Sequence, residues 1–129
     1  MISLISRWKL RNGCSEPLKA ALNDLAGAVR EHEPGTLAYA VHIEALNTLD
    51  AKGSPLNPPP MPIPGEQQME VVFFEVYENT AALQAHLGGT AFTTFKKDWA
   101  DQFYMDPAGS GWPVTETTYL ERESAFFRT

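Results

Sequence analysis

The sequence has few of the residues that mark several large classes of protein. Only one of its 129 residues, Cys14, is a cysteine, so no disulfide can form within the chain, and the disulfide-stabilised class of secreted domains is excluded. Basic residues are also scarce, because 10 Lys and Arg stand against 16 Asp and Glu and the longest basic run is Lys96-Lys97. Nucleic acids and anionic membranes are bound through clusters of basic side chains. We therefore expect neither of them as a partner.

Long apolar runs are missing as well. The chain has no apolar stretch of the roughly 18 residues that a membrane-spanning helix needs. Its N-terminal segment is too short in its apolar part for a signal peptide, and Arg7 and Lys9 interrupt it. The single cysteine favours a reducing compartment. Together these absences predict a soluble, cytoplasmic protein.

What the chain does contain is enough apolar material for one core. Hydrophobic residues make up 43% of the sequence, and its length is typical of one domain. A folded domain of this size hides roughly two-thirds of the surface that its unfolded chain exposes. We therefore expect residues 1–129 to form a single, ordered domain.

Four segments have the pattern of β-strands. Apolar and polar residues alternate in 2–10, 36–44 and 114–122, whereas 69–77 is apolar on both faces. In the second of these segments one face is predicted to carry four apolar side chains: Leu37, Tyr39, Val41 and Ile43.

Three further segments have helical signals. From Ser15, a suitable N-cap, to the stop at Pro34-Gly35, apolar residues recur every three or four positions. A short alanine-rich helix follows residues 78–80 and ends at Gly88-Gly89, and Thr90 is a suitable N-cap for a third helix. Aromatic residues recur at helical spacing in that third helix, which is more typical of a core-facing stripe than of a pocket: Phe92, Phe95, Trp99 and Phe103.

A proline-rich insertion, residues 47–68, separates the second and third predicted strands. Its run 58–65 reads PPPMPIPG, and proline at this density fits neither a helix nor the interior of a sheet. We expect a loop that packs over its own subunit or over a partner. A ligand for proline-reading domains is the weaker interpretation, because it depends on one Pro-x-x-Pro match.

The order of these elements predicts an α+β fold. The predicted order is strand, helix, strand, strand, two helices, strand. This order closes most simply as two split βαβ units, which form a ferredoxin-like, four-stranded antiparallel sheet with helices on one face. The segment 69–77 is apolar on both faces, yet the helices can cover only one of them. Because no remaining segment is long enough to cover the other face, we expect a homodimer that buries it against a second copy.

One stretch resembles a known family. Residues 75–86, EVYENTAALQAH, followed by Thr90-Ala91-Phe92, are similar to the antibiotic biosynthesis monooxygenase domain, whose third strand ends in Glu-x-aromatic before an alanine-rich helix that ends in His. Pro34-Gly35-Thr36 fits the same pattern. The likeness follows the element order over 1–122 and is specific over about residues 69–95. It implies a dimeric α+β barrel whose members include cofactor-free quinol and anthrone oxygenases, haem-degrading oxygenases and proteins without established activity.

The chain departs from the haem-degrading members of that family. Their iron-binding His falls at Lys96, the Asn of their first strand falls near Ser6, and the Trp of their third strand falls at Tyr77. An ammonium group is a poor iron ligand, so we expect neither haem nor another cofactor. No metal site is expected either, since His42-x-Glu44 offers two ligands and tetrahedral zinc takes three or four.

The resemblance implies oxygenation that draws its electrons from the substrate. A deprotonated phenol, hydroquinone or anthrone can pass one electron to dioxygen and then recombine with it. The protein needs an apolar cavity, a base and a way to stabilise the anion. The candidate catalytic residues are Tyr77, His86 and Glu75, with Glu75 orienting the imidazole of His86. The candidate substrate-binding residues are aromatic: Tyr39, Phe74, Phe92, Phe95, Trp8 and Trp99.

Structural roles compete with these catalytic ones. His86 could cap the last carbonyls of its helix, and Glu75 could have a purely structural partner that its burial demands. Among the aromatic candidates we expect Tyr77, and after it Tyr39, to line the cavity. The leading interpretation is a homodimeric, cofactor-independent monooxygenase that acts on an aromatic or quinol-type small molecule. The alternative is a non-catalytic or isomerase-type protein of the same fold that binds a small molecule.

Overall fold

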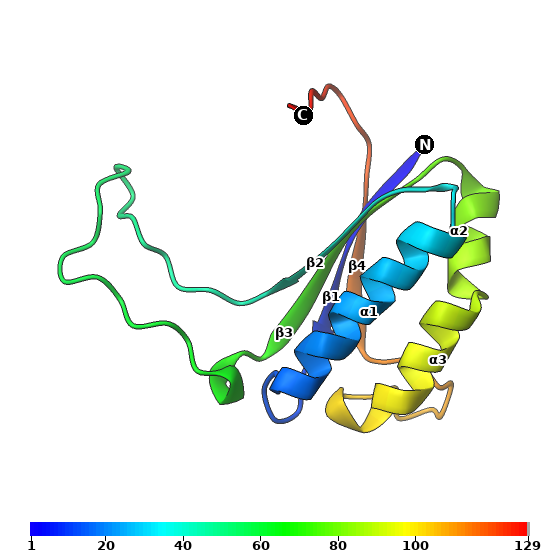
Figure 1. The fold of residues 1–129 in the computed structure, drawn as a ribbon, viewed down its shortest axis with the longest axis horizontal. Helices are drawn as coiled ribbons and strands as arrows, with labels where there is room; N and C mark the ends of the chain where they lie inside the picture. The colour runs from blue at the N-terminus through cyan, green and yellow to red at the C-terminus, as the bar shows by residue number, and fades with distance from the viewer. Residues whose placement is uncertain (129) are drawn as a thin grey trace.

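The computed structural model describes residues 1–128 as a four-stranded antiparallel sheet with its helices on one face (Figure 1). The elements are β1 (Ile2–Lys9), α1 (Glu16–His32), β2 (Thr36–Ile43), η1 (Gly65–Gln67), β3 (Glu70–Tyr77), α2 (Thr80–Leu87), α3 (Thr90–Trp99), η2 (Ala100–Gln102) and β4 (Thr115–Leu120). The strands lie in the order β2-β3-β1-β4, and each neighbouring pair is antiparallel. This confirms the predicted ferredoxin-like α+β fold.

Helix α1 begins and packs as its sequence predicts. The Ser15 hydroxyl caps it by accepting a hydrogen bond from the Leu18 amide at 3.3 Å, which satisfies one of the free N–H groups of the first turn. Its apolar stripe is buried in the main core: Leu18, Leu22, Leu25 and Val29. Burying side chains of this size stabilises the fold by about 1.5–3 kcal/mol each.

The two helices before β4 differ from the prediction at two points. Within the predicted helix start 78–80, Asn79 is the residue that caps α2, through a 2.9 Å bond from the Ala82 amide. Thr90, however, is the first helical residue of α3 and not its cap, because Gly89 takes the extended cap conformation. Phe103 is not part of the helical stripe, since α3 ends at Trp99; it is buried beyond η2, where it pairs with Leu10.

One predicted core residue of β2 is exposed. Tyr39, Val41 and Ile43 pack against the main core, but the side chain of Leu37 is 53% exposed. The register between β2 and β3 shifts between Thr36 and Ala38, so one extra residue lies in a β-bulge. A bulge breaks the alternation of side chains between the two faces, and this places Leu37 outside the core.

The second face of the sheet is apolar and has no covering layer within residues 1–128 (Figure 1). Side chains alternate along β3, so Val72, Phe74 and Val76 point away from the helices; Val76 is already buried, whereas Val72 and Phe74 are partly exposed. Phe74 pairs with Ile5 on one side and with Ala40 on the other, which extends the apolar surface over three strands. This face is therefore free to contact another layer.

The proline-rich insertion projects from the end of the β2–β3 hairpin (Figure 1). Residues 45–59 are exposed, so this part of the insertion does not pack over its own subunit; its contact with a partner stays a prediction. Its base is closed where Glu44 accepts hydrogen bonds from the Gln68 side chain and from the Met69 amide. The η1 turn rests on the segment before α1, with a 2.8 Å bond from the Cys14 amide to the Gly65 carbonyl.

We expect Gly13→Ala to destabilise the fold more than Gly53→Ala does. Both glycines have a φ near +80°, but a Cβ on Gly13 would lie 2.5 Å from the Glu66 Cα, whereas a Cβ on Gly53 would meet nothing within 4 Å. In each variant the left-handed backbone conformation of the alanine lowers the free energy of unfolding by about 1–2 kcal/mol. Only Gly13→Ala also displaces η1, so we expect its free energy of unfolding to fall by about 3 kcal/mol or more. Urea unfolding of both variants measures this difference, and equal losses would contradict it.

Candidate functional site

A cavity of about 240 Å³ lies between the helix face of the sheet and the helices α2 and α3. Its floor is formed by side chains of β1 and β4: Leu4, Ser6, Trp8, Thr115, Thr117 and Tyr119. Its walls come from β3, α2, α3 and the loop after η2: Glu75, Leu83, His86, Leu87, Phe92 and Trp112. Most of this lining is apolar, which is the usual setting for a small-molecule site with a few polar groups.

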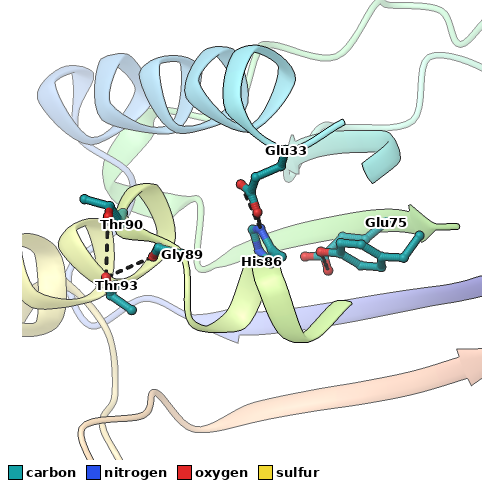
Figure 2. A network of polar contacts seen from close by, with 7 residues as sticks. Glu33, Glu75, His86, Gly89, Thr90 and Thr93 are labelled. Carbon is teal, nitrogen blue, oxygen red and sulfur yellow. Dashed lines mark hydrogen bonds and ion pairs between the residues drawn. The ribbon is translucent and has the colours of Figure 1, made fainter. Parts of the chain in front are cut away.

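His86 presents an unprotonated nitrogen within this site. Its Nδ1 lies 2.9 Å from the Glu33 Oε1 (Figure 2), and since carboxylate oxygens accept, Nδ1 donates. Burial lowers the pKa of the imidazole below its usual 6.5, and this outweighs the opposing attraction of Glu33. His86 is therefore neutral near pH 7, and its Nε2, which has no hydrogen-bond partner among residues 1–128, carries a free lone pair.

Glu33, and not Glu75, is the carboxylate that orients His86. Glu33 is the C-cap residue of α1, and the chain turns there into β2, above the end of α2. Its side chain also lines two surface grooves of about 480 and 540 Å³. No sequence pattern indicated this contact, because Glu33 lies 53 positions before His86 and has the pattern of any acidic residue at the end of a surface helix.

Glu75 is a buried acid with a shifted pKa. Its side chain points toward His86 (Figure 2), is only 7% exposed, and accepts a 2.7 Å bond on Oε2 from the Tyr77 hydroxyl. Burial raises its pKa from 4.5 to about 7, although the bond from Tyr77 opposes the rise. Near neutral pH this carboxyl group can therefore either give or take a proton, as is common for acids in active sites.

The two tyrosines that we expected in the cavity wall lie behind it. Tyr77 is fully buried in a small cluster with Leu4 and Leu83, and its hydroxyl is engaged by Glu75. Burial raises the pKa of Tyr77 far above its usual range, so it stays protonated and continues to donate. Tyr39 packs on the His86 ring with centroids 5.1 Å apart and does not line the cavity. The expectation that both side chains line the cavity was wrong, because the strand pattern predicts which face of the sheet a side chain is on and not how deeply it is buried.

The aromatic candidates separate into three locations. Trp8 and Phe92 line the cavity and contact one another, with ring centroids 5.8 Å apart. Phe95 is part of the main core, and Trp99 lines a groove between α1 and α3 on the outside of the helices. Phe74 lies on the opposite face of the sheet, because it alternates with Glu75 along β3. Only the first two can therefore contact a molecule in the cavity.

Trp112, which the sequence analysis did not single out, forms one wall of the cavity. The loop that carries it is held by bonds from the Asp106 amide to the Trp112 carbonyl and from the Val114 amide to the Tyr104 carbonyl. The ammonium group of Lys96 lies 3.6 Å from the centroid of the Trp112 ring. A cation thus stacks on this wall of the cavity.

A chain of hydroxyl groups crosses the floor of the cavity. The Trp8 indole N–H donates to the Ser6 hydroxyl oxygen at 3.0 Å. The Ser6 and Thr117 hydroxyl groups are also 3.0 Å apart, and either can be the donor. These side chains bring a second polar region to a site whose other polar groups, Glu75 and His86, belong to β3 and α2.

Residues 1–128 contain neither a group of metal ligands nor a helix suited to span a membrane. No three His, Cys, Asp or Glu side chains lie close enough together to hold a metal ion in this part of the chain. None of the helices described there is both long and apolar enough to cross a membrane.

The comparisons with known proteins agree with the observed fold. A family model described as antibiotic biosynthesis monooxygenase matches residues 1–98. No protein among the curated ones that were compared matches the sequence. Similar solved structures include Rv0793 of Mycobacterium tuberculosis, with 20% identity, a TM-score of 0.58 and 96% of each chain covered.

Two more structures show the same likeness in fold. One is named an antibiotic biosynthesis monooxygenase; it has 20% identity and a TM-score of 0.57, and the match covers 96% of this chain and all of that one. The other, from Bacteroides fragilis, is described as a dimeric protein of unknown function with a ferredoxin-like fold; it has 11% identity and a TM-score of 0.56, with 94% and 95% coverage. At these identities the likeness shows the fold alone.

We expect Glu75→Gln to stabilise the protein at pH 8 and to change its stability little at pH 5. Because the pKa of Glu75 is about 7 when folded and near 4.5 when unfolded, the folded state binds more protons between these values. The free energy of unfolding of the wild type therefore falls as the pH rises through this window, by about 3 kcal/mol at most. Glutamine carries no charge and can still accept from Tyr77.

Urea unfolding of both proteins at the two pH values measures this effect. The titration of His86 is common to wild type and variant, so their difference isolates Glu75. A gain of about 1–3 kcal/mol is expected at pH 8. A difference that is the same at both pH values would show that the Glu75 charge is not the cause.

Proposed function

The chain belongs to the antibiotic biosynthesis monooxygenase family, and from this premise we propose that it is a cofactor-independent monooxygenase acting on an aromatic or quinol-type small molecule. The observation that carries the proposal is the pairing, at one apolar cavity, of a neutral buried imidazole and a carboxyl group with a pKa of about 7. The first group can take a proton and the second can give one.

The reaction starts with removal of a proton from the substrate. The Nε2 of His86 takes the proton of a phenolic or benzylic group, and Glu33 stabilises the imidazolium that forms. The carbanion or phenolate passes one electron to dioxygen, and the two radicals combine into a peroxide anion. Glu75 protonates this anion. Loss of the remaining C–H proton and of hydroxide from this hydroperoxide leaves one oxygen atom on the substrate as a carbonyl and releases the other as water, so the two C–H bonds of that carbon supply both electron pairs.

The contact between His86 and Glu33 provides a route for the proton. Nε2 is the buried imidazole nitrogen without a partner among residues 1–128, whereas Nδ1 contacts Glu33, which also lines grooves on the outer surface. When Nε2 takes up a proton, the imidazole can therefore pass its Nδ1 proton to Glu33 and on to solvent. Tyr77 acts through Glu75, whose carboxylate it orients, and is in this scheme a positioning residue.

The size of the cavity limits the substrate. An apolar cavity of about 150 Å³ holds a benzene molecule, and this one measures about 240 Å³. A substrate of one or two fused rings fits, with Trp8, Phe92 and Trp112 available to stack on its faces.

The same pair of groups supports a second candidate function, which is isomerisation. A base and an acid that face one cavity can move a proton between two atoms of a bound molecule without dioxygen. This candidate requires turnover under anaerobic conditions, whereas the oxygenase requires oxygen consumption.

We expect His86→Gln to lower the rate of oxygen uptake with hydroquinones and anthrones by about 100-fold or more, which is the usual contribution of a general base. Glu33→Gln should lower it about tenfold, because the imidazolium loses its charged partner. The control is His32→Gln, since His32 is an exposed histidine at the end of α1 and should leave the rate unchanged. An oxygen electrode measures the rates. Uptake by the wild type that does not exceed the uncatalysed rate would contradict the proposal.

We further propose that two copies pair through the open face of the sheet. The apolar side chains of that face need cover, and the Bacteroides fragilis structure of similar fold is described as dimeric. Sedimentation at micromolar concentration should give the mass of two chains. Phe74→Glu should raise the dissociation constant about 100-fold or more by placing a charge in the interface, while Tyr104→Glu, in the exposed loop after η2, should not. A monomeric wild type would refute this pairing.

A further inference from the structure

The larger part of the proline-rich insertion, residues 47–64, forms an arm that projects from the rest of the chain. Its first 13 residues, 47–59, are all exposed. Figure 1 shows the arm extending away from α1, α2 and α3 and curving toward the side of the sheet that the helices leave open. Three large apolar side chains of the arm lie outside any core: Leu49 is 49% exposed, Leu56 36% and Met61 80%. Apolar side chains gathered on an exposed segment mark an interaction site.

The arm keeps its shape through hydrogen bonds within itself. The Asp50 amide donates to the Ser54 carbonyl at 2.8 Å, and the Leu56 amide donates to the Thr48 carbonyl at 3.0 Å. The Asp50 carboxylate also accepts a 3.0 Å bond from the Ser54 amide. Residues 58–60 are all proline, which restricts the backbone further. A segment that already has its shape loses little conformational entropy when it docks on a partner.

The open face of the sheet is small for a stable dimer interface. Three of its four strands have eight residues each. A face of this size measures about 19 Å across the strands and about 26 Å along them, which is roughly 500 Å². A stable protein–protein interface buries about 800 Å² on each partner. Pairing of the two sheets alone therefore leaves a shortfall, and a further segment has to supply the remaining area.

We propose that the arm of each copy docks on the second copy and forms part of the dimer interface. This inference rests on the proposed pairing of the open faces and adds a second contact to it. The two copies are related by a two-fold axis. An arm that extends past the open face of one copy therefore lies against the other copy, and the reverse holds as well. Docking covers Leu49, Leu56 and Met61 and supplies the area that the sheet lacks.

The double variant Leu49→Glu with Met61→Glu tests this contact. Both side chains are exposed in the single chain, so the variant should fold as the wild type does. Two charges placed in a contact that excludes water should raise the dissociation constant of the dimer about tenfold or more. Sedimentation equilibrium from nanomolar to micromolar concentration measures the constant, and circular dichroism checks the fold.

Leu37→Glu is the matched control for the double variant. Leu37 is a leucine of similar exposure, 53%, but it lines a groove beside α1 and lies outside both the arm and the open face. It should leave the dissociation constant unchanged.

Proteolysis of the arm gives an independent measurement. Lys52 lies in the exposed turn of the arm, where trypsin can cut after it. At a concentration at which the wild type is dimeric, this cleavage should be about tenfold slower than in Phe74→Glu at the same concentration, because cleavage follows the population in which the arm is free. Phe74→Glu is the suitable reference, since its charge lies on the sheet face and leaves the arm itself unchanged.

Two results would overturn the inference: an unchanged dissociation constant in the double variant, or equally fast cleavage after Lys52 in the wild type and in Phe74→Glu. Neither result would count against pairing of the sheets, which the dissociation constant of Phe74→Glu tests separately. A wild type that sediments as a monomer would refute the pairing and the arm contact together.

Discussion

Strand β3 is apolar on both faces, and this constraint organises the rest of the molecule. It is an inner strand, bonded to β2 and β1 along its whole length, so every second side chain must point toward the helices. Phe73 and Tyr77 take that direction and anchor the two parts of the core, and Glu75 lies between them. A carboxyl group on an inner strand and between two large aromatic side chains cannot avoid burial.

The same burial gives the cavity its chemistry. It raises the pKa of Glu75 and lowers that of His86, which brings an acid and a base near neutral pH within one apolar site. Each group has one partner that fixes its orientation, Tyr77 for the acid and Glu33 for the base. The fold supports these groups at a cost in stability, as is usual where a protein keeps ionisable side chains away from water.

Local sequence patterns were sufficient to predict the helices and strands but not the contacts between them. The Ser15 cap, the stripe of α1 and the order of strands and helices along the chain all follow from neighbouring residues, and each is present. Leu37 was misplaced because a bulge depends on pairing with another strand, and strict alternation hides it. Tyr77 was misplaced because its depth depends on which helix covers it. The partner of His86 was missed because Glu33 approaches only when α1 and α2 pack against the same sheet.

The sequence by itself determined the fold class, the family likeness, the apolar second face of the sheet and the presence of Glu75 and His86 in one motif. These features follow from residue types that recur at short spacing, because that spacing determines whether a segment forms a strand or a helix and which of its side chains share a face. Only the tertiary structure decided that Glu33 holds the imidazole, that Trp112 forms a wall and that Ser6, Trp8 and Thr117 share one chain of hydrogen bonds. Hydrogen bonds need atoms within about 3 Å of one another, and for residues far apart in the chain that distance is set by how whole elements pack.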